Sequence, residues 1–345
     1  MEVQVSVTVD VERFLGKLRS GGAVKGRELL ESLDRVSLDA VLAWTRHASD
    51  SRFGKILKTY IPGKKFPAIS VTGTSCELHC KHCNEHYLHG MIPAETPERL
   101  EQVLTSIYER GGTGALISGG STRDGVVEMR RFHGVLGRIA RSTSLQLNLH
   151  TGLIDEATAR ALRETGITAI SLDLVGDDAT IRDIYGLDKT VEDYKLVLHG
   201  LLRAGFTNQH IIPHVCIGLD KGKVVGEYAV LDYIRELNPA LVVFIIIIPP
   251  KQQGNGGFSN VPPDDVSRLV AMTRVLFPGA EISLGCMRPG GKIRDEYDIA
   301  AFKAAITRIA IPTRAVLTMA ERGGYSIERI ENCCAISSPG PPSSR

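Results

Sequence analysis

The sequence predicts an α/β protein built as a (β/α)8 barrel of the TIM type. From Phe66 onward, short β-branched runs alternate with amphipathic helical stretches. Eight such units can be counted, and repeated β-then-α units form parallel sheets with right-handed crossovers. The run from Leu241 to Pro250 is almost continuously apolar, as in a strand buried on both faces. A doubly wound open sheet is the alternative, and the count of eight favours the closed barrel.

The predicted strands are rich in β-branched residues and end at glycine, polar or turn residues. They are Ala68–Thr72, Ala115–Ser118, Leu145–Leu149, Thr168–Leu172, Ile211–Ile217, Val242–Ile248, Glu281–Leu284 and Arg308–Ile311. The helices between them carry apolar residues at helical spacing. They are Pro97–Arg110, Val127–Arg141, Asp155–Thr165, Val191–Ala204, Val225–Leu237, Asp264–Leu276 and Asp298–Thr307.

The ends of the chain differ from this alternating pattern. Residues 1–65 form a helical N-terminal lead-in, with helical spacing in Val11–Leu18 and Gly26–Leu33 and with Ser37 as a helix cap. We expect the barrel over residues 66–315 and a C-terminal extension over 316–336. The tail over 337–345 is rich in serine and proline, which predicts disorder.

Composition excludes several classes of function. The chain has 345 residues, and its 41 basic and 39 acidic residues leave a net charge of +2, so nothing favours nucleic acid or an anionic membrane surface as a partner. The N-terminal segment MEVQVSVTVD lacks the features of a signal peptide, and residues 241–250 are too short for a membrane helix of ~20 residues. We therefore expect a cytoplasmic protein, where seven cysteines indicate metal or redox chemistry rather than disulfides.

The strongest chemical signal is a cluster of three cysteines directly after the first strand. Cys76, Cys80 and Cys83 are separated by three and two residues, and the loop that holds them would lie at the mouth of a barrel, where active sites are found. Three thiolates on a short loop can hold three corners of an iron–sulfur cubane and leave the fourth iron open. Zinc, with a nitrogen ligand from His79, His82, His86 or His89, is an alternative, as is a fortuitous group of buried thiols.

With this spacing in this place, the chain resembles the radical S-adenosylmethionine (SAM) superfamily. The resemblance implies a [4Fe-4S] cluster on Cys76, Cys80 and Cys83, whose open iron binds the amino and carboxylate groups of SAM. It also implies an electron donor such as ferredoxin or flavodoxin. Reductive cleavage of SAM would then give a 5′-deoxyadenosyl radical that abstracts a hydrogen atom from the substrate.

The resemblance also implies a set of residues that bind SAM. His82 takes the place of a residue that is usually aromatic and lies near adenine. In the Gly-Gly-Glu-like turn of the family, which holds the SAM amino group, this chain has serine instead of the acid. Ser171 and Asp173 take the place of polar residues that hold the ribose. The candidates for SAM binding are therefore His82, Gly119, Gly120, Ser121, Ser171, Asp173 and Ile217. No catalytic acid or base is singled out.

Four further cysteines lie outside this cluster. Cys216 reads as a core residue, because cysteine is among the most often buried residue types. Cys286 lies in a loop rich in glycine and proline after the seventh strand, and Cys333 and Cys334 are adjacent near the C-terminus. If the C-terminal segment folds back over the barrel, Cys286 with Cys333 or Cys334 could hold a second iron–sulfur cluster. The alternative is that these thiols have no role.

A second cluster and a complete barrel are features of the biotin- and lipoyl-synthase-like branch of this superfamily. The stretches Val71–Cys76 and Ser118–Gly125 resemble the archaeal-type lipoyl synthase, which is built from two radical SAM subunits. This resemblance implies sulfur insertion into a protein-bound octanoyl chain, a companion radical SAM subunit and an octanoylated carrier protein. Another radical SAM biosynthetic enzyme, such as a mutase, a maturase or a biotin-synthase-like enzyme, is the first alternative. A non-catalytic scaffold stabilised by zinc or iron–sulfur, or an electron carrier, is the second.

Overall fold

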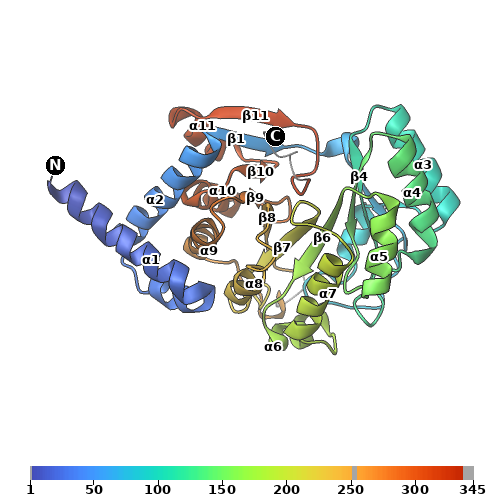
Figure 1. The fold of residues 1–345 in the computed structure, drawn as a ribbon, viewed down its shortest axis with the longest axis horizontal. Helices are drawn as coiled ribbons and strands as arrows, with labels where there is room; N and C mark the ends of the chain where they lie inside the picture. Colours follow the sequence, from blue (N-terminus) through green and yellow to red (C-terminus); the bar gives the residue numbers. More distant parts are fainter. Residues whose placement is uncertain (1, 251–254, 337–345) are drawn as a thin grey trace.

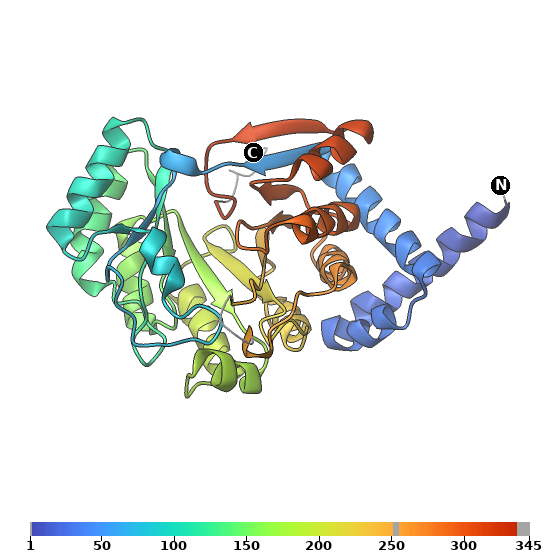
Figure 2. The same ribbon diagram turned by 180° about the vertical axis from the view of Figure 1, so that it is seen from behind.

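A curved, all-parallel sheet of eleven strands runs through the part of the chain that the computed structural model describes, residues 2–250 and 255–336, and helices cover its outer face (Figures 1 and 2). The tail over 337–345 lies outside the described residues. All eight predicted strands are present and neighbour one another in chain order. They are β2 (Ala68–Ser70), β4 (Gly114–Ser118), β5 (Gln146–His150), β6 (Ala169–Leu174), β7 (Ile211–Ile217), β8 (Leu241–Ile246), β9 (Glu281–Leu284) and β10 (Arg308–Ala310). The predicted barrel-type α/β fold is confirmed.

Each connection between these strands contains a helix, as parallel pairing requires. The helices are α3 (Pro97–Glu109), α4 (His133–Ser142), α5 (Glu156–Thr165), α6 (Asp178–Thr180), α7 (Val191–Arg203), α8 (Glu227–Tyr233), α9 (Pro263–Leu276) and α10 (Lys292–Ala304), and α11 (Arg314–Arg322) follows β10. Local capping fixes several starts: Thr96 accepts from the Arg99 amide at 3.2 Å, and Asp155 accepts from the Thr158 amide at 2.8 Å. Among the helices of the described chain, none has the length and apolar character to span a bilayer.

Three strands were not predicted, and they determine how the sheet ends. They are β1 (Ile56–Tyr60), β3 (Ile92–Pro93) and β11 (Ser326–Ile330). β1 pairs with both β10 and β11, and β3 pairs with β2. Because β1 occupies the edge of β10, the ladder does not close from β10 onto β2 and ends instead at β11 and β3. The β-barrel arc is therefore open, and the two terminal segments of the chain extend it.

The segment after β11 crosses the end of the sheet at which the strands begin. The Thr113 hydroxyl donates to the Glu331 carbonyl at 3.0 Å, and the Asn332 amide donates to the Gln146 side chain at 2.6 Å. Cys334, Ala335 and Ile336 are buried against residues at the starts of the strands, namely Ala169, Ile212 and Leu241. The C-terminal segment thus folds back into the arc, but from the end opposite to the mouth.

The N-terminal lead-in contains two long helical segments, which pack on α8, α9 and α10 (Figures 1 and 2). The first, α1 (Glu2–Glu31), is broken at Gly22, where φ is 78°, and the amides of Ala23 and Val24 donate to Asp232 at 2.7 and 3.0 Å. The second is α2 (Arg35–Phe53). Its cap is Asp34, which accepts from the Ser37 amide at 2.7 Å, so the predicted cap at Ser37 is wrong. Asp34 caps the helix because its carboxylate accepts from the amide of Ser37, the third residue of the helix.

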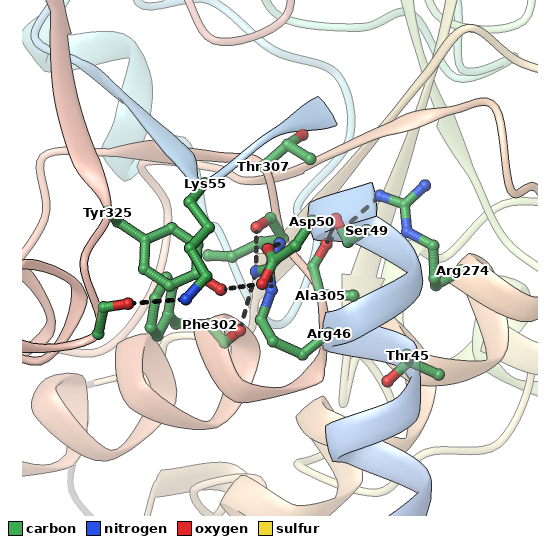
Figure 3. A network of polar contacts seen from close by, with 12 residues as sticks. Thr45, Arg46, Ser49, Asp50, Lys55, Arg274, Phe302, Ala305, Thr307 and Tyr325 are labelled. Atoms are coloured by element: carbon green, nitrogen blue, oxygen red, sulfur yellow. Dashed lines mark hydrogen bonds and ion pairs between the residues drawn. The ribbon is translucent and has the colours of Figure 1, made fainter. Parts of the chain in front are cut away.

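A polar network ties α2 to the last helices and strands of the sheet (Figure 3). Arg46 pairs with Asp50 at 2.9 Å and donates to the carbonyls of Phe302 and Ile306 at 3.1 and 2.7 Å. The Tyr325 hydroxyl also donates to Asp50. The Arg46 and Asp50 side chains are only 13% and 14% exposed, so each charge depends on its partners.

We predict that Arg46→Met lowers the free energy of unfolding by about 2–4 kcal/mol, because it leaves Asp50 buried without its cation and two carbonyls without a donor. Arg27→Met is the matched control, because Arg27 forms an exposed pair with Glu31 one helical turn away, and it should cost less than about 0.5 kcal/mol. Chemical denaturation of both variants measures the difference. Equal losses would show that the network adds nothing.

Candidate active site

The cysteine loop follows β2 and packs against the turn that ends β4. The Ser121 amide donates to the Cys76 sulfur at 3.4 Å, and the amides of Glu85 and Tyr87 point to the Cys83 sulfur and act to lower its pKa. The Glu77 amide donates to the Ser121 carbonyl at 2.8 Å, and the Lys81 amide to the Ile184 carbonyl at 2.8 Å. Amides directed at sulfur are suited to thiolates, so the loop is built to carry negative charge.

Gly120 allows this close approach. A Cβ atom at Gly120 would lie 1.9 Å from the Ser75 carbonyl oxygen and 2.6 Å from the Cys76 Cα. Its neighbour Gly119 is less restricted, since a Cβ there would first meet the Thr72 side chain at 2.9 Å. The Thr72 hydroxyl in turn accepts from the Gly120 amide at 2.6 Å and donates to the Ser75 carbonyl at 2.9 Å. The two loops therefore fit together only when residue 120 has no side chain.

Burial keeps the Cys80 and Cys83 thiols of this loop protonated. Desolvation, and then the neighbouring Cys83 and Cys76, raise the pKa of Cys80 to about 12, and desolvation also raises the pKa of Cys83. Cys76 donates to the Leu78 carbonyl at 3.2 Å, and Cys80 donates to the Tyr185 carbonyl at 3.7 Å. No three His, Cys, Asp or Glu side chains of the described residues stand in coordinating positions. A cation that binds here would displace the thiol protons.

A cavity of about 330 Å³ opens beside this loop, at the ends of the strands. Its polar and aromatic lining residues are His82, Tyr87, Ser121, His150, Asp173, Tyr185, Tyr194, His214 and Cys216. Its apolar lining residues are Leu78, Leu153, Leu174, Leu187, Ile245, Ile246, Ile247, Ile248 and Met287. Such a cavity suits a ligand that has both a polar and an apolar part.

Three polar side chains of neighbouring strands meet in this cavity. His150 Nδ1 lies 3.1 Å from an Asp173 carboxylate oxygen, and the His150 and His214 rings meet edge to face at 5.1 Å. His214 Nδ1 lies 3.0 Å from the Ile212 carbonyl, which fixes its other ring nitrogen as a bare acceptor. Desolvation and the nearby His150 lower the pKa of His214 to about 4, so this ring is neutral at pH 7. Although desolvation raises the pKa of Asp173, its histidine neighbours lower it overall, so this side chain is a carboxylate.

His82 contributes a second neutral ring. Desolvation lowers its pKa to about 4, and its ring meets that of Tyr185 edge to face at 5.1 Å. Its Nδ1 atom is buried and has no hydrogen-bond partner among the described residues. A buried nitrogen without a partner is costly, so a ligand that supplies a hydrogen bond here would bind favourably.

The turn after β7 follows Cys216, which lines the cavity. Gly218 has φ 78°, and a Cβ there would lie 2.2 Å from a Val261 methyl carbon. Glu227 accepts from the amides of Gly218 and Val225 at 2.6 and 2.7 Å. Because burial removes the hydration of the charged form, the pKa of Glu227 is raised to about 7, although the backbone amides and Arg27 lower it. The Glu227 carboxyl group therefore stabilises the turn through hydrogen bonds to its two ends.

Comparison with known families identifies the central segment. Residues 70–222 match the model of the Radical SAM superfamily. This segment is a radical SAM domain. It runs from Ser70, the last residue of β2, to the turn after β7 and includes the cysteine loop, and the family uses a [4Fe-4S] cluster and SAM. The site fits both groups: the loop offers three thiols with amides directed at sulfur, and the cavity offers an unpartnered His82 nitrogen and the Asp173 carboxylate.

The chain is also similar to curated biotin synthases. It is 26% identical to the one from Synechococcus elongatus over 239 residues, which cover 64% of this chain and 69% of that protein. It is 23% identical to the one from Geobacter sulfurreducens over 236 residues, which cover 67% and 69% of the two chains. These identities support the radical SAM assignment and leave the reaction open.

Two solved structures share the fold. Methylornithine synthase (PylB) superimposes with a TM-score of 0.63 and 16% identity, covering 92% of this chain and 97% of that one. HydG, a maturase of the [FeFe]-hydrogenase, superimposes with a TM-score of 0.68 and 16% identity, covering 94% and 76%. At this identity the likeness shows the fold alone.

The residues predicted to bind SAM fall into three groups. His82, Ser121 and Asp173 line the cavity, and Gly119 and Gly120 pack behind the cysteine loop. Ser171 and Ile217 are buried and are not among the residues that line it. The Ser171 hydroxyl donates to the Asn148 side chain at 2.9 Å, so it already has a partner. His214 and Glu227 were not predicted as site residues. The alternation along β7 places His214 on the same face as Cys216, and this pattern could have indicated His214.

Cys286 follows β9, and it influences the adjacent pair Cys333 and Cys334 electrostatically. The Cys286 thiol is exposed, and desolvation followed by Cys334 raises its pKa to about 11. Within the buried pair, the Cys333 thiol lowers the pKa of Cys334, and Arg308 and Arg288 lower it further. Arg308 also donates to the carbonyls of Cys334 and Ile336 at 3.3 and 2.6 Å. Cys216 lies in the cavity wall, where desolvation raises its pKa strongly.

We predict that Gly120→Ala prevents assembly of the cluster, because the added methyl group would push the Cys76 backbone away from its place. Iron bound after anaerobic reconstitution should fall by about four atoms per chain. Gly134→Ala is the control, since a Cβ there meets only the end of the Arg138 side chain at 3.5 Å. Full iron content in the Gly120 variant would contradict the proposed fit of the loops.

His214 should make the protein less stable in acid. Its pKa is about 4 in the folded chain and 6.5 as a free side chain, so the unfolded chain binds more protons between these values, and stability falls as pH drops below about 6.5. The loss should approach roughly 3 kcal/mol near pH 4. Denaturation of the wild type and His214→Asn between pH 7.5 and 4.5 measures it, and the variant should show the weaker dependence. Parallel curves would contradict this assignment.

Proposed function

We propose that this protein is a radical SAM enzyme that inserts sulfur into an unactivated C–H bond of a protein-bound octanoyl chain, as one component of a lipoyl synthase. The companion radical SAM subunit, the octanoylated carrier protein and a cytoplasmic location belong to the same proposal. The observation that carries it is that Met287, which follows Cys286 in the chain, lines the same cavity as Ile245–Ile248 and as His82 of the cysteine loop.

The loop after β9 is held tightly against β8. The Ile246 amide donates to the Met287 carbonyl at 2.9 Å. A Cβ at Gly285 would lie 2.8 Å from an Ile245 methyl carbon and 3.2 Å from the Phe244 carbonyl oxygen. Both neighbours of Cys286 are therefore held against β8: Gly285 by close packing, and Met287 by a backbone hydrogen bond. A saturated acyl chain along Ile245–Ile248 would share the cavity with the residues that bind SAM and would reach Met287, the neighbour of Cys286.

An auxiliary cluster would use Cys286 together with Cys333 or Cys334. Arg308 anchors the C-terminal segment through two carbonyls and pairs with Glu281. Arg288 pairs with Asp298 at 2.7 Å, and both side chains are fully buried. Two guanidinium groups near Cys334 favour its thiolate, which is the form that binds iron. The pair is adjacent in sequence, so we assign one of its members, and we choose Cys334 because its carbonyl accepts from Arg308 at 3.3 Å.

The [4Fe-4S] cluster and SAM would supply the radical that abstracts hydrogen. Cys76, Cys80 and Cys83 would hold the first cluster. His82 and Asp173 would bind and orient SAM, the first through its unpartnered nitrogen and the second through its carboxylate. The Ile245–Ile248 wall would exclude water from the acyl chain.

The second candidate function is another radical SAM biosynthetic reaction, of the mutase, maturase or biotin-synthase type. The similarity to biotin synthases favours it specifically. In that case only the first cluster would be essential, and the thiols outside the cysteine loop would be dispensable.

We predict that the reconstituted wild type holds about eight irons per chain and that Cys286→Ala and Cys334→Ala each hold about four. Cys216→Ala is the control and should keep all of them. Both variants should still form 5′-deoxyadenosine from SAM with dithionite but should lose the sulfur-containing product from an octanoylated carrier protein. About four irons in the wild type, unchanged by Cys286→Ala, would exclude sulfur donation from this site and favour the second candidate.

A further inference from the structure

The exposed surface of helix α3 is divided lengthwise into an acidic and a basic half. Glu98 and Glu109 are eleven residues apart. The same interval separates Arg99 from Arg110, which caps the helix at its C-terminal end. Eleven residues complete about three turns of an α-helix, so the members of each pair lie on the same side. The two glutamates line one face of α3, and the two arginines line the neighbouring face, beside the short 3-10 turn η1 (Gly63–Lys65).

These four charges have no ion-pair partner in the part of the chain that the structure describes. Their side chains are exposed, and none of them forms an ion pair with another described residue. The other acidic residue of the helix interior, Glu101, is by contrast paired with Arg138 of α4 at 2.7 Å. Figures 1 and 2 place α3 at the outer edge of the arc, on the side opposite to the N-terminal helices. The four charges are therefore accessible to another molecule.

The order of these charges is self-complementary when a second copy of α3 runs antiparallel to the first. Counted from position 104, Glu98 lies six residues toward the N-terminus and Arg110 six residues toward the C-terminus, which is about 9 Å in each direction. Arg99 and Glu109 lie five residues to either side. A two-fold axis through this position and perpendicular to the helix exchanges the two directions and the two halves. Glu98 of one copy then meets Arg110 of the other, and Arg99 meets Glu109.

The residues between the two halves fit the same axis. Gln102 and Ser106 line both faces of the helix, and each lies two residues from position 104. The axis therefore sets Gln102 of one copy opposite Ser106 of the other, and an amide and a hydroxyl can each donate and accept a hydrogen bond. Antiparallel helices also place the positive N-terminal end of each beside the negative C-terminal end of the other. Charge, hydrogen bonding and helix polarity thus favour one arrangement.

We propose that α3 is the contact surface of a homodimer, in which a second copy of this chain docks antiparallel on the first. The two-fold axis repeats both ion pairs, so the interface holds each of them twice. Exposed ion pairs are individually weak and are screened by salt, so the dimer should form reversibly and dissociate as salt rises. Because the axis reverses α3, it also reverses the strands beside it, and the mouths of the two SAM cavities open in opposite directions. The inference goes beyond the proposed reaction and does not depend on it.

Two double variants with the same composition and the same net charge test this arrangement. Glu98→Arg/Arg110→Glu exchanges two residues that meet in the antiparallel dimer, so every contact still joins opposite charges. Glu98→Arg/Arg99→Glu is its matched counterpart, because it exchanges two residues that do not meet and sets arginine against arginine and glutamate against glutamate. All three positions are exposed. Sedimentation velocity of the anaerobically reconstituted chain, over a series of protein concentrations at low and high salt, measures the dissociation constant of each dimer.

The first variant should dimerise with a dissociation constant within about twofold of the wild-type value, whereas the second should dimerise at least about tenfold more weakly. Wild-type association should weaken as salt rises. The proposal is overturned if the wild type stays monomeric at every concentration, if both variants dimerise as the wild type does, or if the first variant loses the dimer. Loss in the first variant alone would indicate parallel helices, because Glu98 would then meet Arg99 of the second copy.

Discussion

The site depends on the close contact between the loop after β2 and the turn after β4. Parallel pairing brings the two strands side by side and leaves their ends at one edge. There, Gly120 has no side chain, so the Cys76 backbone can lie where a methyl group on residue 120 would clash with it. The Ser121 amide then reaches the Cys76 sulfur. The close packing at Gly120 therefore does two things: it places Cys76 beside the turn after β4, and it brings the Ser121 amide within hydrogen-bonding distance of the Cys76 sulfur.

Around this contact, the structure excludes water on one side of the cavity and concentrates titratable groups on the other. The neutral rings of His82 and His214 and the carboxylate of Asp173 gather at the ends of β6 and β7 and in the cysteine loop, whereas β8 contributes only apolar side chains. Burial lowers the pKa of each ring because a charge there would lose its hydration. The cavity therefore combines a fixed polar surface, suited to a nucleotide, with an apolar wall suited to an alkyl group.

The N-terminal and C-terminal segments both extend the sheet and pack against its last strands and helices. β1 and β11 extend the arc beyond β10, and the segment after β11 enters between the strand starts, where Arg308 holds it. The network around Arg46 and Asp50 fastens α2 to the same region. The sheet therefore ends at β11 on one side and at β3 on the other, and does not close into a barrel.

The sequence by itself determined the alternating strands and helices, the apolar character of β8 and the place of Cys76, Cys80 and Cys83 after the first strand of the arc. These features are local: they depend on periodicity, turn residues and spacing within a few residues. Tertiary structure alone decided that β1 occupies the edge of β10, that Ser171 is used by Asn148 while Asp173 lies beside His150, and that Cys334 influences Cys286 electrostatically. Short, half-exposed strands such as β11 carry too weak a pattern to be recognised. Contacts between residues many positions apart depend on how the whole sheet curves, which no local pattern encodes.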